Sequence, residues 1–266
     1  MSAHDEVLEP DADPVASGTS RAGEPIEPAF RSAAQLDPRL LASTRQQGCF
    51  VTFEGIEGSG KSTQIARLAE RLDGAGEPTV VTREPGGSPL GRRLRGLLLG
   101  GEIARIEPLA ELFLYVADRA QHLREFVEPN LASGTHVLCD RYLDATLAYQ
   151  GFARGLDLDY IRLLHEKPPL DRRPHRTILL DLDPELGLDR ARRRNVELGL
   201  EATEGRFERE TIAFHRRVRE GYLLLAEAEP FRFRIVAAEG TAEEIEARVA
   251  DLLSDLFPAL DDEDPS

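Results

Sequence analysis

A glycine-rich segment that ends in lysine and serine has the spacing of a phosphate-binding loop. Residues 55–62 read GIEGSGKS and fit the pattern G-x-x-x-x-G-K-[ST]. Glycines let backbone N–H groups converge on an anion, the helix that follows directs its positive end at it, and the lysine adds a full charge. We therefore expect a nucleoside triphosphate here, bound by Gly55, Ile56, Glu57, Gly58, Ser59, Gly60, Lys61, Ser62 and Thr63.

The residues around this loop have the order that the motif requires. Residues 49–53 are apolar and predict a buried strand, and residues 62–72 have the period of an amphipathic helix. A glycine-rich turn that binds nothing is the alternative. The use of lysine favours binding, because the chain has only two lysines, Lys61 and Lys167, and takes its other positive charges from arginine.

An acidic residue and a basic residue follow another predicted strand, at residues 135–139. Asp140 stands at the carboxyl end of that strand, where P-loop proteins place the acid that organises magnesium, and Arg141 comes next. A surface ion pair is the alternative. We predict a Mg²⁺ site made by Ser62, Glu57 and Asp140.

An arginine-dense segment, residues 189–194, reads DRARRR. Arg190 and Arg194 are four residues apart and share one face of a helix. A solvated face paired with nearby glutamates would explain the segment, but a phosphate-binding loop in the same domain favours a lid of arginines over the triphosphate. We expect Lys61, Arg190 and Arg194 to be catalytic, although the spacing leaves open which lid arginine reaches the transferred phosphate.

Strands and helices alternate along the chain. Strands are predicted at residues 49–53, 79–82, 135–139, 177–181 and 232–237, and helices at 62–72, 91–99, 108–131, 145–148, 156–165, from 184, at 211–228 and at 241–256. This alternation indicates an α/β fold with a parallel sheet covered on both faces. The active site of such a fold lies outside the carboxyl ends of the strands.

Composition divides the chain into one domain and two tails. Residues 1–48 lack apolar periodicity and predict a disordered extension, residues 49–258 predict the P-loop domain, and residues 259–266 predict an acidic tail. The net charge of −15, about half of it in the tails, argues against a nucleic-acid binder. The sequence shows no hydrophobic signal region and no membrane-length apolar run, so we expect a cytoplasmic protein. Cys49 and Cys139 are expected to be reduced core residues.

Several motifs together resemble the thymidylate kinase family. They are FEGIEGSGKSTQ at residues 53–64, TREPGG at 82–87, ADR at 117–119, DRY at 140–142 and AYQG at 148–151. The resemblance implies the fold of P-loop nucleoside monophosphate kinases with a five-stranded parallel sheet. It also implies transfer of a phosphoryl group from ATP to dTMP with Mg²⁺, a step in dTTP synthesis, in a homodimer. The arginines at 190–194, with none inside the phosphate loop, resemble the bacterial arrangement with a basic lid.

The resemblance also implies roles for single residues. Arg119 and Thr146 match positions that meet the thymine base, Arg141 matches one that grips the acceptor phosphate, and Tyr149 matches the ring that excludes a ribose 2′-hydroxyl. Tyr115 stands where the family usually has a phenylalanine that stacks on thymine. The remaining substrate-binding residues implied are Glu84, Pro85 and Gln150.

The implied mechanism is direct in-line attack by a phosphate oxygen of dTMP, which needs no protein nucleophile and no strong general base. We therefore expect the six histidines to be structural or exposed. Two other interpretations fit parts of the sequence. One is a small P-loop kinase with a different nucleotide or nucleoside acceptor, and the other is a regulatory protein that binds ATP without turnover.

Overall fold

A parallel sheet organises the part of the chain that the structure describes. The structure is a computed structural model, and it describes residues 47–100, 103, 105–199 and 205–260. Within these residues, five strands form one sheet in the order β2-β3-β1-β4-β5, and every neighbouring pair is parallel. The strands are β1 (Phe50–Glu54), β2 (Thr79–Arg83), β3 (His136–Asp140), β4 (Arg176–Asp181) and β5 (Phe233–Ala237).

The sequence of the central strands explains their position. All five residues of β1 are buried, as a strand covered on both faces requires. Its one central polar side chain, Thr52, is satisfied by a hydroxyl–hydroxyl hydrogen bond of 2.8 Å to Thr177 on the neighbouring β4. This hydrogen bond offsets the cost of burying the Thr52 hydroxyl in the middle of the sheet.

The helical elements follow the predicted alternation. They are α2 (Lys61–Gly74), α3 (Pro89–Leu99), α4 (Pro108–His122), η2 (Leu123–Val127), α5 (Glu128–Ala132), α6 (Leu143–Thr146), η3 (Leu147–Ala153), α7 (Leu158–Leu164), α8 (Pro184–Leu198), η4 (Phe207–Arg209), α10 (Ile212–Ala228), α11 (Ala242–Asp251) and η5 (Pro258–Leu260).

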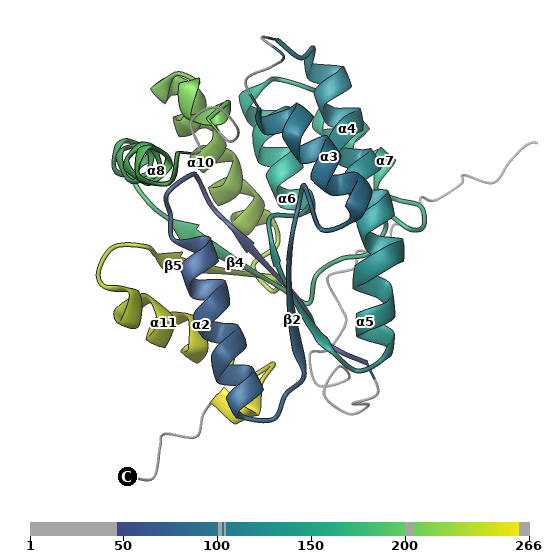
Figure 1. Ribbon diagram of the computed structural model, residues 1–266, viewed down its shortest axis with the longest axis vertical. Helices are drawn as coiled ribbons and strands as arrows, with labels where there is room; N and C mark the ends of the chain where they lie inside the picture. Colours follow the sequence, from purple (N-terminus) through teal and green to yellow (C-terminus); the bar gives the residue numbers. More distant parts are fainter. Residues whose placement is uncertain (1–46, 101–102, 104, 200–204, 261–266) are drawn as a thin grey trace, which may run out of the picture. The chain divides into compact units, whose positions relative to one another are not determined.

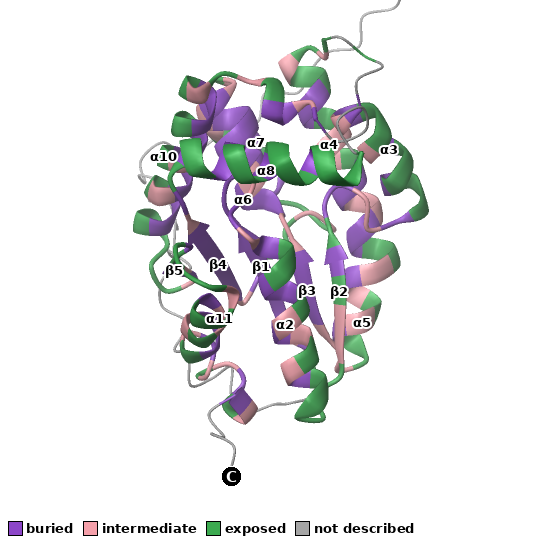
Figure 2. Ribbon diagram, turned by 60° about the vertical axis from the view of Figure 1, so that its left-hand side comes forward, coloured by how far each residue is buried: buried purple, intermediate pink, exposed green. Residues whose placement is uncertain are grey.

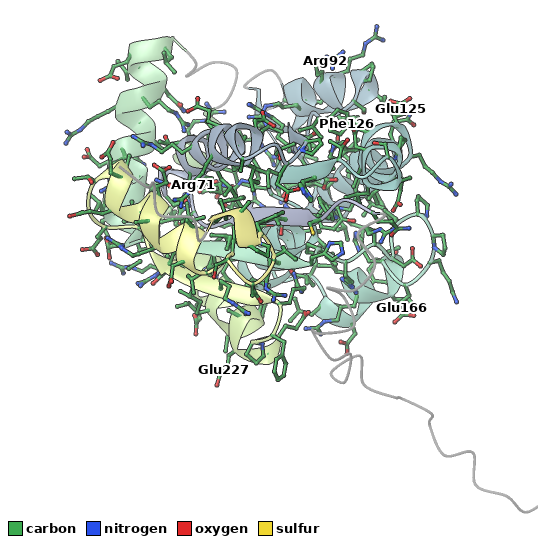
Figure 3. All side chains as sticks on the ribbon, turned by 90° about the horizontal axis from the view of Figure 1, so that it is seen from below. Arg71, Arg92, Glu125, Phe126, Glu166 and Glu227 are labelled. Atoms are coloured by element: carbon green, nitrogen blue, oxygen red, sulfur yellow. The ribbon has the colours of Figure 1, made fainter. Side chains whose placement is uncertain are left out.

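Helices cover both faces of the sheet (Figure 1). On one face, α2 packs against the strands and against α11. On the other face, α5 contacts β3, and α10 contacts β4 and β5. The arrowheads of the strands point to the end of the domain where α6 and α8 lie, and the sheet between the layers is largely buried (Figure 2). Charged side chains such as Arg92, Glu166 and Glu227 point outward (Figure 3).

The first residues of α11 and α8 are capped by side chains of the residues just before them. The side chain of Thr241 accepts from the N–H of Glu244, and Glu244 accepts in return from Thr241, which is a capping box at the start of α11. Asp183 caps the N–H groups of Glu185 and Leu186, so α8 begins at Pro184 as expected.

One predicted helix differs from the structure in its interior. The pattern at residues 108–131 predicts a continuous α-helix, but Leu123–Val127 form a π-helical segment between α4 and α5. The short helix predicted at 145–148 likewise continues as π-helix over Leu147–Ala153. A π turn adds one residue to the hydrogen-bonded ring and shifts the following apolar positions by one, a change that this apolar pattern does not resolve.

The predicted tails lie mainly outside the described residues, which exclude 1–46 and 261–266. At the edges of those gaps, the buried Gly48 donates its N–H to Leu131 O at 2.8 Å, and the carbonyl of the buried Leu260 accepts from Arg71. Both residues therefore pack with the domain. Cys139 is buried and Cys49 is half-buried, and the two do not form a disulfide bond with each other. Among the described residues, no helix has the length and apolar character to span a membrane.

Candidate active site

A cavity of about 350 Å³ opens at the carboxyl ends of β1, β2 and β3. Many of the residues predicted to form the site line this cavity. They are Glu57, Gly58, Gly60, Lys61, Ser62, Thr63, Glu84, Pro85, Tyr115, Arg119, Asp140, Arg141, Thr146, Tyr149, Gln150, Arg190 and Arg194. Parallel strands bring these distant motifs to one edge of the sheet. The cavity therefore has a phosphate-loop side and a second side made by β2, α4 and η3.

The phosphate loop connects β1 to α2 with glycines in the left-handed region. Gly55, Gly58 and Gly60 have φ angles of 135°, 72° and 92°, which other residues rarely adopt. Gly60 is the N-cap of α2, and no side chain caps the N–H groups of that terminus. Those N–H groups, with the helix dipole behind them, suit a phosphate.

Lys61 lies across the loop. Its Nζ donates to Ile56 O at 2.8 Å and to Gly55 O at 3.1 Å, with Ser59 Oγ at 3.3 Å. Burial of the ammonium, and then the charge of Arg141, lower the pKa of Lys61 to about 8. The loop carbonyls thus hold the lysine beside the space where a phosphate would bind.

The loop also touches the arginine helix directly, through two glycines. A Cβ on Gly58 would lie 2.1 Å from Gly187 O in α8, and a Cβ on Gly187 would lie 2.5 Å from Glu57 O. Only glycine at both positions allows the two backbones to approach this closely. The Gly58–Gly187 contact therefore sets where α8 starts relative to the phosphate loop.

Ser62 and Asp140 lie next to each other in the cavity wall. Ser62 Oγ donates to Asp140 Oδ2 at 3.1 Å, while Asp140 Oδ1 is buried and has no hydrogen-bond partner among the described residues. A hydroxyl and a carboxylate with an unsatisfied oxygen are suitable ligands for Mg²⁺. No group of three or more His, Cys, Asp or Glu residues with metal-binding geometry occurs in the described chain, so such an ion would also need phosphate or water ligands.

Glu57 is oriented away from that pair and toward the second side of the cavity. Its Oε1 accepts from Tyr149 Oη at 2.6 Å and from Arg141 Nη2 at 2.9 Å, and its Oε2 lies 3.2 Å from His215 Nδ1. Burial alone would raise the pKa of Glu57, but the charges of Arg141 and His215 outweigh it and lower the pKa. The metal-binding role predicted for Glu57 has no such contact in the described residues and stays a prediction.

Arg141 occupies a strained backbone position between the two sides. Its φ is 68°, a left-handed value for a residue that is not glycine. The guanidinium donates to Glu57, to Gly55 O at 3.1 Å and to Tyr222 Oη at 3.2 Å, and it stacks 4.8 Å above the ring of Tyr149. These contacts hold a permanent positive charge at the cavity wall, as an acceptor phosphate requires.

Arg119 is an almost fully enclosed charge of the second side, with 1% of its surface exposed. Its Nε donates to Glu84 Oε2 at 2.8 Å, its Nη2 donates to Thr146 Oγ1 at 3.1 Å, and its Nη1 lies 2.9 Å from His165 Nε2. Its guanidinium carbon also lies 4.9 Å from the centre of the Tyr142 ring. The two residues predicted to meet the base, Arg119 and Thr146, are thus hydrogen-bonded to each other.

The other predicted acceptor residues line the same side. Glu84 also accepts from His122 Nδ1 at 2.9 Å, and Pro85 follows it in the cavity wall. Gln150 Nε2 donates to the buried Glu111 at 2.7 Å, and Tyr115 is half-buried at the wall. The structure therefore brings all eight predicted substrate-binding residues to one cavity.

The four arginines of α8 separate into two pairs. Arg190 and Arg194 line the cavity, in keeping with their i, i+4 spacing. Arg192 instead donates to Glu208 O at 2.9 Å, and Arg193 pairs with Asp189 on the surface. The catalytic prediction for Arg190 and Arg194 thus agrees with the direction of the helix face.

Sequence reasoning missed the buried histidines around the site. His122, His165 and His215 are all at most 1% exposed, and each contacts a predicted site residue, Glu84, Arg119 and Glu57 respectively. The expectation of structural or exposed histidines did not anticipate these contacts. Only the proximity of His122 and His215 to the matched motifs was visible in the sequence, and His165 carried no signal.

Three features together define a P-loop nucleoside monophosphate kinase. They are the order of the sheet, the phosphate loop after the central strand, and a second binding side at the same edge of the sheet. A comparison with protein-family models matches residues 53–249 to thymidylate kinase. The chain belongs to the thymidylate kinase family.

Similar proteins agree with this assignment. The chain is 53% identical over 200 residues to a thymidylate kinase of Syntrophotalea carbinolica, covering 75% of this chain and 92% of that protein. It is 53% identical over 196 residues to one of Desulfovibrio desulfuricans, covering 74% and 90%. Among solved structures, a thymidylate kinase from Ehrlichia chaffeensis matches with a TM-score of 0.62 and 30% identity, covering 78% of this chain and 99% of that one.

Proposed function

We propose that this chain catalyses transfer of the γ-phosphoryl group of ATP to dTMP, which yields dTDP and ADP. The observation that carries the proposal is the single cavity that joins a phosphate loop to a pocket lined by Arg119, Thr146, Arg141 and Tyr149. An ATP-dependent switch needs the first part and not the second. Phosphoryl transfer between two bound nucleotides needs both.

On the donor side, the loop N–H groups and Lys61 bind the phosphates of ATP. The ammonium exchanges its contacts with the loop carbonyls for phosphate oxygens, which are stronger acceptors. Arg190 and Arg194 compensate the charge that spreads over the transferred group. Their positions on one helix face let both reach the same space.

On the acceptor side, Arg141 holds the phosphate of dTMP for in-line attack, with the Glu84–Pro85 turn as part of the same wall. Arg119 and Thr146 meet the base, with Gln150 beside them and Tyr115 as the stacking ring. Tyr149, fixed by Glu57 at 2.6 Å, limits the room for a ribose 2′-hydroxyl. The acceptor phosphate is ionised near neutral pH, so no general base is needed.

Ser62 and Asp140 would hold Mg²⁺, because Asp140 keeps one buried oxygen without a partner among the described residues. The bound ion would neutralise charge on the β- and γ-phosphate oxygens. Glu57 is the third proposed ligand, and it would have to release a hydrogen bond to Tyr149 or Arg141 to reach the ion.

We also propose that the chain forms a homodimer through the exposed apolar residues of α4 and α7. Phe113 and Leu163 are 44% and 58% exposed, so both leave apolar side-chain surface that a second copy of the chain could cover. Light scattering at micromolar concentration should give twice the mass of the chain, and Phe113→Glu should shift it toward the monomer. A monomeric wild-type protein would contradict this part of the proposal.

The test of the reaction is ADP release with ATP and Mg²⁺ across dTMP, dUMP, dCMP, UMP, AMP, GMP and thymidine. We expect strong preference for dTMP, lost in Lys61→Ala. Arg194→Ala should lower kcat about 100-fold, the size of a lost transition-state contact, whereas the matched control Arg193→Ala should change it little. Equal turnover of another acceptor, or ATP binding without acceptor-dependent turnover, would contradict the proposal.

A further inference from the structure

Arg119 gives three of its five N–H groups to the protein and keeps two. Within the described residues, its N–H partners are Glu84, His165 and Thr146, one on each nitrogen. A guanidinium has one N–H on Nε and two on each terminal nitrogen. The side chain lines the cavity, so one N–H on Nη1 and one on Nη2 remain for a ligand.

The hydrogen bonds of His165 fix its protonation. Its Nδ1 lies 2.7 Å from the carbonyl oxygen of Ile161, which can only accept, so Nδ1 carries a hydrogen. Its Nε2 faces Arg119 Nη1, which can only donate, so Nε2 carries none. The ring is therefore neutral. Burial, and then the charge of Arg119, lower the pKa of His165 to about 4, in keeping with this form.

The position of His165 is set by packing. It is the C-cap of α7, and its backbone N–H donates to Arg162 O at 2.9 Å. Its side chain is 1% exposed, and Ile161 in the preceding turn is fully buried. Because the ring bonds to its own helix at one nitrogen, the other nitrogen presents a lone pair in a fixed direction.

We propose that His165 is a positioning residue for nucleotide selection: its neutral ring accepts a hydrogen bond from Arg119 and aims the two remaining N–H groups of that guanidinium at a carbonyl on the pyrimidine. The inference rests on the proposed function, since it assigns selectivity to the same acceptor cavity. The two remaining N–H groups of Arg119 present donors to the ligand at this point. They match the C4 carbonyl of thymine or uracil and oppose the C4 amino group of cytosine.

Glu84 and Thr146 cannot supply this orientation by themselves. Glu84 takes the Nε side of the guanidinium, and Thr146 takes Nη2. Without an acceptor at His165, Nη1 loses its protein partner, and its other N–H, which would serve the base, is no longer held in one direction. The ligand must then fix the orientation of the Arg119 guanidinium when it binds, which lowers its affinity.

The experiment compares His165→Leu, which removes the acceptor, with His165→Gln, whose amide restores one acceptor oxygen and one donor. We expect His165→Leu to raise KM and Kd for dTMP about tenfold, the effect of roughly one hydrogen bond to a charged group. The preference for dTMP over dCMP in kcat/KM should fall by a similar factor. KM for ATP and kcat should stay within about twofold, and His165→Gln should recover most of the loss.

A histidine outside the site provides the matched control. His136 accepts from the Cys49 N–H at 2.9 Å, near the opposite end of β3, so His136→Leu should cost stability without changing KM for dTMP. Unchanged dTMP binding in a folded His165→Leu protein would overturn the inference, and so would equal losses for ATP and dTMP. Should the leucine variant not fold, His165→Met, whose thioether is a weak acceptor, decides by the same readouts.

Failure of the inference can be told apart from failure of the proposed function. A wild-type enzyme without selective dTMP turnover contradicts the function. A wild-type enzyme with normal turnover and an unaltered His165→Leu variant contradicts only the role of His165.

Discussion

Replacing Glu84 by glutamine isolates the charge of one buried carboxylate. Glu84 accepts from Arg119 through Oε2 and from His122 through Oε1, at 2.8 and 2.9 Å. Glutamine can keep both hydrogen bonds: its amide oxygen accepts from Arg119, and its NH₂ donates to His122 Nδ1. The histidine then moves its proton to Nε2 and donates to Thr82 Oγ1, which lies 2.7 Å away. Only the negative charge opposite Arg119 is lost.

The expected cost follows from burial. Arg119 and Glu84 are 1% and 3% exposed, and removing one partner of a buried ion pair costs about 3–5 kcal/mol. Asp118 reduces this cost. Burial and the charge of Glu84 raise the pKa of Asp118 to about 6, so at pH 7 it is already largely ionised and keeps a negative charge near Arg119 when Glu84 is replaced. We therefore expect about 3 kcal/mol, the lower end of that range.

Urea unfolding at pH 7 measures this cost, and Glu246→Gln serves as the control. Glu246 also pairs with an arginine, Arg67, at 2.7 Å, but its side chain is 26% exposed. A pair of that kind contributes less than about 1 kcal/mol. The reasoning is refuted if the two variants lose the same stability with unchanged m-values, since the burial of the charge would then not matter.

Three further outcomes are expected. Gly58→Ala should abolish nucleotide binding by calorimetry, because its Cβ would overlap Gly187 O at 2.1 Å, whereas Gly134→Ala, with a similar φ of 85° and open space, should cost only about 1 kcal/mol. As pH falls from 6.5 toward 4, the stability of the wild type relative to His165→Gln should drop by up to about 3 kcal/mol in urea titrations. The reason is that unfolded His165 gains a proton in this window and the folded form does not. Tyr115→Phe should leave KM for dTMP within about twofold, since the stacking face is unchanged; a tenfold rise would assign a role to the hydroxyl.

The strands and the phosphate loop could be predicted because their signals are local. The apolar run at residues 49–53, which predicts β1, and the spacing from Gly55 to Ser62 each lie within a few residues. The i, i+4 spacing of Arg190 and Arg194 likewise predicts one helix face, and both residues line the cavity. These inferences need only helix and strand geometry.

The supporting network could not be predicted because its partners meet only after folding. Arg119 and His165 are 46 residues apart in the sequence, and Glu57 lies more than 150 residues before His215. Nothing in the residues near His165 distinguishes a ring that holds an arginine from a core histidine. The π-helical segment Leu123–Val127 was missed for a different reason, since one i→i+5 turn shifts the apolar positions by only one residue, which the pattern does not resolve.

The close approach of Gly58 to Gly187 has a mechanical consequence. It makes the start of α8 a fulcrum against the phosphate loop. At a rise of 1.5 Å per residue, Arg190 lies about 4.5 Å along the helix from that pivot and Arg194 about 10 Å. Any tilt of α8 about the fulcrum therefore displaces Arg194 more than twice as far as Arg190. Arg190 would therefore stay nearly in place when α8 tilts, while Arg194 would move toward or away from the phosphate loop.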